Sequence, residues 1–182
     1  MPLTPRLRKA SLAAHVATSV GWLGAVAVFL ALAIAGLTSQ DGQMVRAAYL
    51  VMGLTGWFVI VPLCFASLLT GLALSLGTTW GLFRHYWVLA KLLMTVPATF
   101  VLLVHMQPID HIAGVAAKAS LSGAELHGLR IQLVVQAGAA LLVLLVATVL
   151  SVYKPKGMTR YGWRRQNEQR TASAVMAEMT TA

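Results

Sequence analysis

Residues 10–40 contain no charged side chain and are mostly apolar. A helix needs about 20 apolar residues to cross the hydrocarbon core of a bilayer, and three later segments also reach that length. The four helices are predicted near residues 12–37, 47–76, 86–106 and 129–152. The sequence therefore predicts an all-α fold, a transmembrane four-helix bundle occupying residues 1–153.

The composition supports a bilayer rather than water as the solvent of this chain. Hydrophobic residues make up 58% of it and charged residues 10%, whereas soluble domains carry about 25% charged residues. A soluble fold could not bury so much apolar surface. The lone cysteine, Cys64, excludes a disulfide framework.

The N-terminus has one competing interpretation. Arg6, Arg8 and Lys9 precede the first apolar run, as basic residues do in a secretory signal peptide. The apolar region of a signal peptide has only about 7–15 residues, and residues 10–40 exceed that length. The longer run favours an uncleaved first transmembrane helix.

The basic residues predict the orientation in the membrane, because Lys and Arg beside the helix ends accumulate on the cytoplasmic side. One side carries Arg6, Arg8, Lys9, Arg84, Lys154, Lys156, Arg160, Arg164, Arg165 and Arg170, and the other carries Arg46, Lys118 and Arg130. Both termini are therefore expected in the cytoplasm. This clustering explains the net charge of +9 without a nucleic-acid partner.

The connections between the helices complete the predicted architecture. Short loops make successive helices antiparallel neighbours, as in an up-down bundle. Pro62 and Pro97 are expected to kink their helices. The outer segment 108–128 is expected to form a short interfacial helix, and the basic cytoplasmic tail 154–182 to lie on anionic headgroups before fraying.

The first predicted helix carries an ionisable residue, His15, about one turn from its start. Ser19, Trp22 and Phe29 follow on nearly the same face. An ionisable group inside a membrane is a functional candidate, because leaving it unpaired in hydrocarbon is costly. The alternative is a histidine satisfied by a backbone carbonyl or a headgroup.

Lys91 occupies a similar depth in the third predicted helix, with Trp87 one turn before it. Its ammonium could face a cofactor or another anionic group. The alternative is that the side chain extends to the inner headgroups, as lysines near helix ends commonly do. His15 and Lys91 are expected at the same end of the bundle.

A second set of candidate ligands is expected on the outer side: His105, Met106, His111 and His127. Imidazole and thioether groups suit copper. Their irregular spacing also fits scattered, solvated histidines. Lys91 and His105 are separated by about 21 Å of helical rise, so one haem cannot use both His15 and His105.

Small residues recur every four positions on the first two predicted helices. They are Ala13, Ala17, Gly21 and Ala25 on the first, and Ser67, Gly71 and Ser75 on the second. Such ridges let helix backbones approach closely in lipid. No motif of a known hydrolase or nucleotide-driven enzyme is present, so no catalytic residue is assigned.

Two short patterns carry a resemblance to known families. His15-x6-Trp22-Leu23-Gly24, with Trp87-x3-Lys91, resembles a broad group of small bacterial four-helix membrane proteins. That group includes the copper-resistance D family and the haem-binding four-helix protoporphyrinogen oxidases. With Gly71, Trp80-Gly81-Leu82 and Lys154-Pro155-Lys156, the chain also resembles a bacterial integral membrane family of unknown function.

The oxidase resemblance implies that His15 is a haem ligand and that Lys91 contacts the cofactor. In that family one residue separates the tryptophan from the lysine and an arginine closely follows the histidine. Here the gap is three and no arginine follows His15, so the resemblance extends to haem binding only. The copper family would instead imply outer-side copper handling by His105, Met106 and His111.

The resulting hypothesis is a multi-pass protein of the bacterial inner (cytoplasmic) membrane that binds haem b or a related porphyrin. His15 is the expected iron ligand, Trp22 and Trp87 are expected cofactor contacts, and Lys91 is expected near a propionate. A redox or electron-transfer role would follow from the cofactor. The alternatives are copper binding or uptake, and a cofactor-free membrane partner subunit or homo-oligomer.

Overall fold

The computed structural model describes residues 4–77, 83–117, 124–153 and 157–181. The predicted all-α class is confirmed, because the described residues form helices and no strand. The elements are α1 (Pro5–Thr38), α2 (Gly42–Thr55), the π-helix η1 (Gly56–Ile60), α3 (Val61–Gly77), α4 (Tyr86–Ala117), α5 (Ala124–Tyr153) and α6 (Arg160–Thr181).

Four long apolar helices are also confirmed. The described residues contain four stretches long and apolar enough to cross a membrane: Pro5–Thr38, Gly42–Gly77, Tyr86–Ala116 and His127–Tyr153. The second stretch joins α2, η1 and α3 into one continuous helix. These are the spans of a multi-pass membrane protein, and each observed helix is longer than its prediction.

Local chemistry sets the starts of the first two helices. Thr4 is the N-cap of α1, where its hydroxyl accepts a hydrogen bond from the N–H of Leu7, and Pro5 occupies the first turn. Asp41 caps α2 by accepting a hydrogen bond from the N–H of Gln43. These side chains satisfy backbone donors that lack a partner within the helix.

Pro62, where the sequence predicts a kink, lies in the first turn of α3, directly after the π-helix. Proline has no N–H to donate, so the carbonyl of Phe58 loses its α-helical partner. Just before the proline, the N–H of Val61 bonds to the carbonyl of Gly56, five residues earlier. In contrast, α4 continues through Pro97 and Pro108.

The prediction of a separate outer helix after Pro108 is wrong for the residues described. Residues 108–117 extend α4, and Ile109, Ile112 and Ala116 are buried in the core. Their apolar face therefore packs inside the protein instead of lying on the membrane surface. Residues 118–123 of the predicted segment lie outside the described residues.

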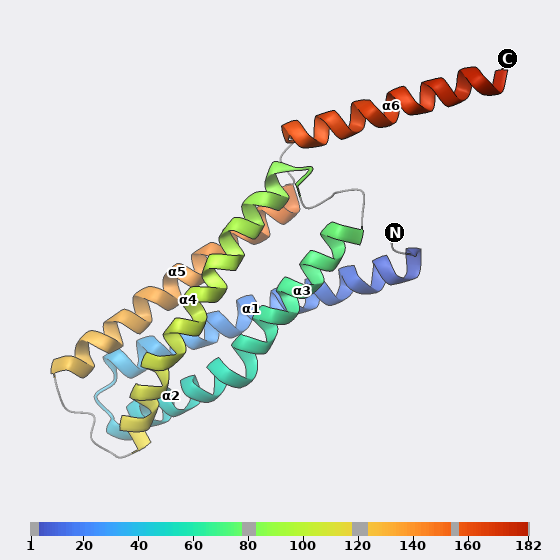
Figure 1. Ribbon diagram of the computed structural model, residues 1–182. Helices are drawn as coiled ribbons and strands as arrows, with labels where there is room; N and C mark the ends of the chain where they lie inside the picture. The colour runs from blue at the N-terminus through green and yellow to red at the C-terminus, as the bar shows by residue number, and fades with distance from the viewer. Residues whose placement is uncertain (1–3, 78–82, 118–123, 154–156, 182) are drawn as a thin grey trace.

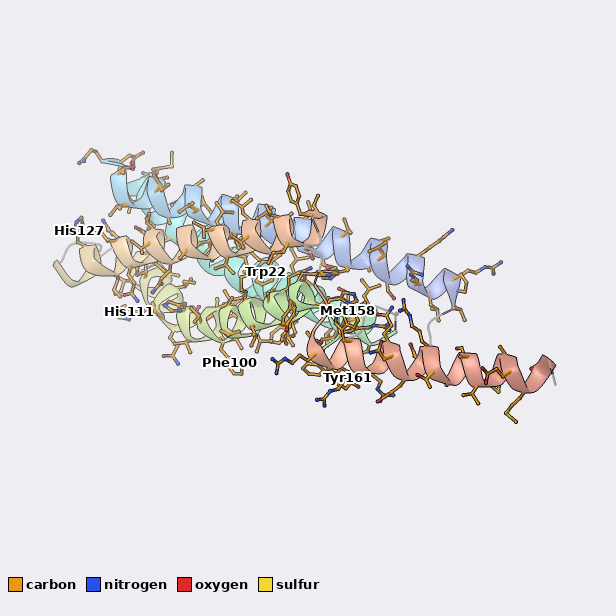
Figure 2. All side chains as sticks on the ribbon, turned by 90° about the horizontal axis from the view of Figure 1, so that it is seen from above. Trp22, Phe100, His111, His127, Met158 and Tyr161 are labelled. Atoms are coloured by element: carbon orange, nitrogen blue, oxygen red, sulfur yellow. The ribbon has the colours of Figure 1, made fainter. Side chains whose placement is uncertain are left out.

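Helix α1 packs against α2, α3 and α5 (Figure 1). Its buried residues Trp22, Val26, Phe29 and Ala33 join Tyr49, Met52, Cys64, Met106, Ile112 and Leu133 in one core cluster. Large apolar side chains such as Phe58, Leu69 and Phe100 stay exposed, and Phe100 points away from the bundle in Figure 2. An apolar exterior around a packed interior suits a protein surrounded by lipid.

Contacts along the helices define two ends of the bundle. Trp57 bonds to Asp110, and Tyr49 lies against Gly36; this region is called the Asp110 end. His15 bonds to Thr70, and Lys91 bonds to Ser151; this region is called the His15 end. Figure 1 shows the N-terminus and α6 on the side of the His15 end.

The C-terminal tail differs from its prediction, since α6 is helical to Thr181 and does not fray after its first residues. Figure 1 shows α6 extending beyond the bundle. Among the described residues, α6 does not pack against the other helices. Its start is held instead by Thr159, whose hydroxyl donates to the carbonyl of Phe83 and whose N–H donates to that of Arg84.

Candidate cofactor site

His15 lies between α1 and α3 and is bound on one side of its ring. Its Nδ1 atom is 3.0 Å from the backbone carbonyl of Ser67 and 3.2 Å from the hydroxyl oxygen of Thr70. The sequence left two alternatives for His15, a functional role or a histidine satisfied by a backbone carbonyl. The contact with the Ser67 carbonyl is the one expected under the second alternative. Whether His15 can also bind a ligand depends on its other ring nitrogen, Nε2.

The partners of His15 fix which nitrogen carries the proton. A carbonyl can only accept, so Nδ1 must donate to Ser67. The Thr70 hydroxyl donates to its own helix, to the carbonyls of Ala66 and Ser67, and is therefore an acceptor toward Nδ1. In the neutral ring Nε2 then carries the lone pair, and it has no hydrogen-bond partner among the described residues.

The predicted small-residue ridge on α3 forms the cradle for this histidine. A Cβ placed on Gly71 would lie 3.0 Å from Cε1 of His15, so the absent side chain makes room for the ring. The hydroxyls of Ser19 and Ser67 are 2.8 Å apart across the same interface. Ser67 and Gly71 therefore serve helix packing, as expected, and also position His15.

Lys91 is held on the other helix pair, α4 and α5. Its Nζ atom donates to the hydroxyl of Ser151 at 2.6 Å and lies 5.9 Å from the ring centre of Trp87. Ser151 belongs to α5, and Trp87 belongs to α4, the helix of Lys91 itself. Ser151 was not identified from the sequence, because nothing in its pattern distinguishes it from other serines in an apolar helix.

The structure brings His15 and Lys91 into the same region, as their equal depth predicted. The two side chains are close enough for their charges to interact. Among the described residues, the hydrogen-bond and ring partners of His15 and Lys91 include no carboxylate. The two basic groups therefore have no carboxylate among their described partners, and an anionic ligand would complement them.

The two tryptophans have different surroundings. Trp22 is buried in the core cluster with Val26 and Phe29, about 10 Å of helical rise from His15. Trp87 is half-buried beside Lys91. Trp87 is thus adjacent to the candidate site, whereas Trp22 forms part of the packed layer beneath it.

The candidate copper ligands do not converge. Met106 is buried over Gly56, while the Nδ1 atom of His105 donates to the carbonyl of Val101 on its own helix. His111 and His127 are exposed, and Figure 2 shows them on different helices at the same end. The described residues contain no group of three His, Cys, Asp or Glu side chains suited to a metal ion, so the structure lends copper no support.

The Asp110 end contains two polar contacts that the sequence did not reveal. The indole N–H of Trp57 donates to the carboxylate of Asp110 at 2.8 Å, and the Arg130 guanidinium lies 5.5 Å from the ring centre of Tyr49. Each contact joins residues far apart in the chain. No spacing rule within one helix could have predicted them.

Comparison with protein-family models, with curated proteins and with solved structures finds no match for this chain. The resemblances based on His15, Trp22, Trp87 and Lys91 therefore stay predictions. Trp80-Gly81-Leu82 and Lys154-Pro155-Lys156, which contributed to one of them, lie outside the described residues.

Proposed function

We propose that this protein binds haem b or a related porphyrin at the His15 end of the bundle and serves a redox or electron-transfer role. His15 would be the iron ligand through Nε2, and Lys91 would pair with a propionate. When bound, the porphyrin iron would supply one-electron chemistry. The residues of this chain would bind the group, orient it and shield it from water.

The observation that carries this proposal is the hydrogen bond from Nδ1 of His15 to the Ser67 carbonyl at 3.0 Å. Histidines that bind metals commonly donate their second nitrogen to a carbonyl or carboxylate, which fixes the tautomer and the ring orientation. His15 has this arrangement, and its Nε2 atom has no hydrogen bond to the described residues.

The charge pattern supports a carboxylate-bearing ligand. Lys91 has only a neutral hydroxyl and an indole ring as its described partners, so its positive charge is not balanced locally. A buried ammonium is costly in hydrocarbon unless an anion is near.

The proposal includes the membrane orientation, with both termini in the cytoplasm of a bacterium and antiparallel neighbouring helices. The antiparallel direction of the second span and α4 is supported by three contacts between them: Gly53 with Ala113, Trp57 with Asp110, and Cys64 with Thr99. Residue numbers rise on one helix as they fall on the other. The excess of Lys and Arg at the His15 end supports its cytoplasmic placement.

The test is the absorption spectrum of the membrane-purified protein after haem-supplemented expression, oxidised and then reduced with dithionite. We expect a Soret band that shifts on reduction and is lost in His15→Ala. His105→Ala is the matched control, because His105 also donates Nδ1 to a backbone carbonyl but lies nearer the Asp110 end. Its spectrum should be unchanged.

Two results would contradict the proposal. One is a featureless spectrum of the folded wild-type protein, which would favour a cofactor-free partner role. The other is an equal loss of the band in both histidine variants, since that would indicate damage to the bundle rather than loss of a ligand. Lys91→Met should weaken haem retention while leaving the band positions in place, because it removes a charge and not a ligand.

A further inference from the structure

Two segments far apart in the chain meet at the His15 end: residues 83–86, where α4 begins, and residues 157–162, where α6 begins. The N–H of Thr159 donates to the carbonyl of Arg84 at 3.0 Å. The hydroxyl of Thr159 donates to the carbonyl of Phe83, and the residue is buried. This contact between the two segments is called the clasp.

The clasp includes the first turn of α4. The first N–H groups of a helix have no partner within it, and that of Tyr86 donates to the carbonyl of Gly157 at 3.4 Å. His85 pairs with Met158 in an isolated β-bridge, while the His85 carbonyl accepts from the N–H of Leu89. The segment that precedes α6 therefore helps to fix where α4 begins.

The Thr159 hydroxyl bonds to both sides of the clasp, because it also accepts from the N–H of Gly162 at 3.1 Å. Gly162 is buried, and a Cβ there would lie 2.6 Å from the Arg84 carbonyl oxygen. Apart from Gly162 and the half-buried Gln166, residues 160–180 are exposed. Among the described residues, α6 is thus held to the bundle through its start.

The candidate site follows the clasp directly in α4. Trp87 is the second residue of this helix, and Lys91 follows one turn later. The Nζ atom of Lys91 lies 5.9 Å from the ring centre of Trp87 and donates to Ser151. Helix ends fray when their first turn is not fixed. Fraying of α4 would displace Trp87, one of the two described partners of the Lys91 amine.

We propose that Thr159 is a positioning residue for the candidate site. By holding the first turn of α4, it keeps Trp87 and Lys91 in the orientation that an anionic ligand would meet. Thr159 itself touches no ligand, since its effect passes through the backbone of α4. The statement about the ligand rests on the proposed function, whereas the statement about Lys91 can be tested without any porphyrin.

The experiment uses the full chain in nanodiscs, without porphyrin. Acetylation of Lys91 by acetic anhydride is compared by mass spectrometry with that of the exposed Lys9, and amide hydrogen exchange is followed over residues 86–91. Thr159→Val removes the hydroxyl and keeps the shape of the side chain. We expect the ratio of Lys91 to Lys9 acetylation to rise about fivefold, the effect of one lost hydrogen bond, with faster exchange of residues 86–91.

Two substitutions control for the lost hydroxyl. Thr159→Ser keeps the hydroxyl and should retain the wild-type acetylation ratio. Thr171→Val makes the same chemical change as Thr159→Val, but the Thr171 hydroxyl donates to the Asn167 carbonyl of its own helix. It should leave the acetylation of Lys91 unchanged.

A second pair of variants opens the clasp without removing a hydroxyl. Gly162→Ala places a methyl group against the Arg84 carbonyl and should raise the acetylation of Lys91 as Thr159→Val does. Gly157→Ala is the matched control, because its Cβ would lie at an ordinary contact distance of 3.5 Å from Cδ2 of Tyr86. Unchanged acetylation of Lys91 in both Thr159→Val and Gly162→Ala would overturn the inference.

Haem retention then tests whether the effect passes through Lys91. Thr159→Val should lower retention in the wild-type background and have no further effect in Lys91→Met, because the two changes act on one interaction. An equal loss in both backgrounds would contradict a positioning role. A protein that retains no haem would refute the proposed function and leave the acetylation result standing, so the two failures are distinguishable.

Discussion

The two ends of the bundle satisfy their polar groups differently. At the Asp110 end, the charged groups meet aromatic partners: the indole of Trp57 donates to Asp110, and Arg130 lies over Tyr49. At the His15 end, both basic side chains are held by neutral oxygens, from Ser67, Thr70 and Ser151. A carboxylate is among the described partners at the Asp110 end, but not among those of His15 and Lys91.

On the proposed function, this difference distinguishes an end dominated by packing from an end that binds a ligand. The Asp110 end contains the large buried side chains Tyr49, Met52, Met106 and Ile112, so close packing dominates there. The His15 end leaves one imidazole nitrogen without a described partner and the charge of Lys91 without a counterion. Substitutions should therefore affect mainly stability at the first end, and mainly ligand binding at the second.

The largest stability loss is expected for Gly36→Ala at the Asp110 end. The new Cβ would lie 2.7 Å from Cζ and 2.9 Å from the hydroxyl of Tyr49, a rigid buried ring. Overpacking of this kind costs about 2 kcal/mol. The free energy of unfolding, measured by denaturant titration in mixed micelles, should fall by that amount. Gly24→Ala, with nothing near its Cβ, should not lower it.

A smaller loss is expected for Gly71→Ala at the His15 end. Its Cβ would meet Cε1 of His15 at 3.0 Å, and this half-buried ring can shift by a few tenths of an ångström. The cost should be about 1 kcal/mol, with a decrease in haem retention that Gly36→Ala does not show. Equal haem retention in the two variants would remove the distinction between the ends.

Ser151→Ala tests how Lys91 is held. It removes the hydroxyl that accepts from Nζ and should cost about 0.6 kcal/mol, the average for hydrogen bonds between membrane helices. Thr148→Ala is the control, since its hydroxyl bonds only to the Leu144 carbonyl of its own helix. If both variants unfold alike, the Lys91–Ser151 bond contributes nothing to stability.

The smallest effect is expected for Trp57→Phe, which keeps an aromatic ring and deletes the donor to Asp110. Both side chains are exposed, so water can replace the lost bond and the cost should be about 0.5 kcal/mol. The same titration measures it, beside Trp163→Phe in α6 as a control. A loss as large as that of Gly36→Ala would show that polar pairing, and not packing, stabilises the Asp110 end.

Much of the fold could be predicted because hydropathy is a property of consecutive residues and can be evaluated from the sequence alone. The four spans follow from the length of the apolar segments, and the inward face of His15, Ser19 and Trp22 follows from helical periodicity. The end of α4 could not be predicted, since the sequence 108–117 suits either a surface helix or a buried one. Only packing against the core, through Ile112 and Ala116, decides between them.

The candidate site also combines residues that the sequence identified with partners that only the structure showed. The sequence identified His15 and Lys91 because an ionisable residue in an apolar helix is conspicuous and costly. Their partners were hidden, since Thr70 and Ser151 are separated from them by more than fifty residues. The candidate copper ligands illustrate the converse: His105 and Met106 are adjacent in the chain, yet His105 bonds to its own helix and Met106 is buried in the core.

The sequence by itself determined that this chain forms long apolar helices, because a run of uncharged residues leaves few alternatives to spanning a bilayer as a helix. The tertiary structure decided which nitrogen of His15 has a partner, which hydroxyl holds Lys91 and which face of α6 is left to the surroundings. Those outcomes depend on the meeting of residues from different helices, which local spacing does not encode.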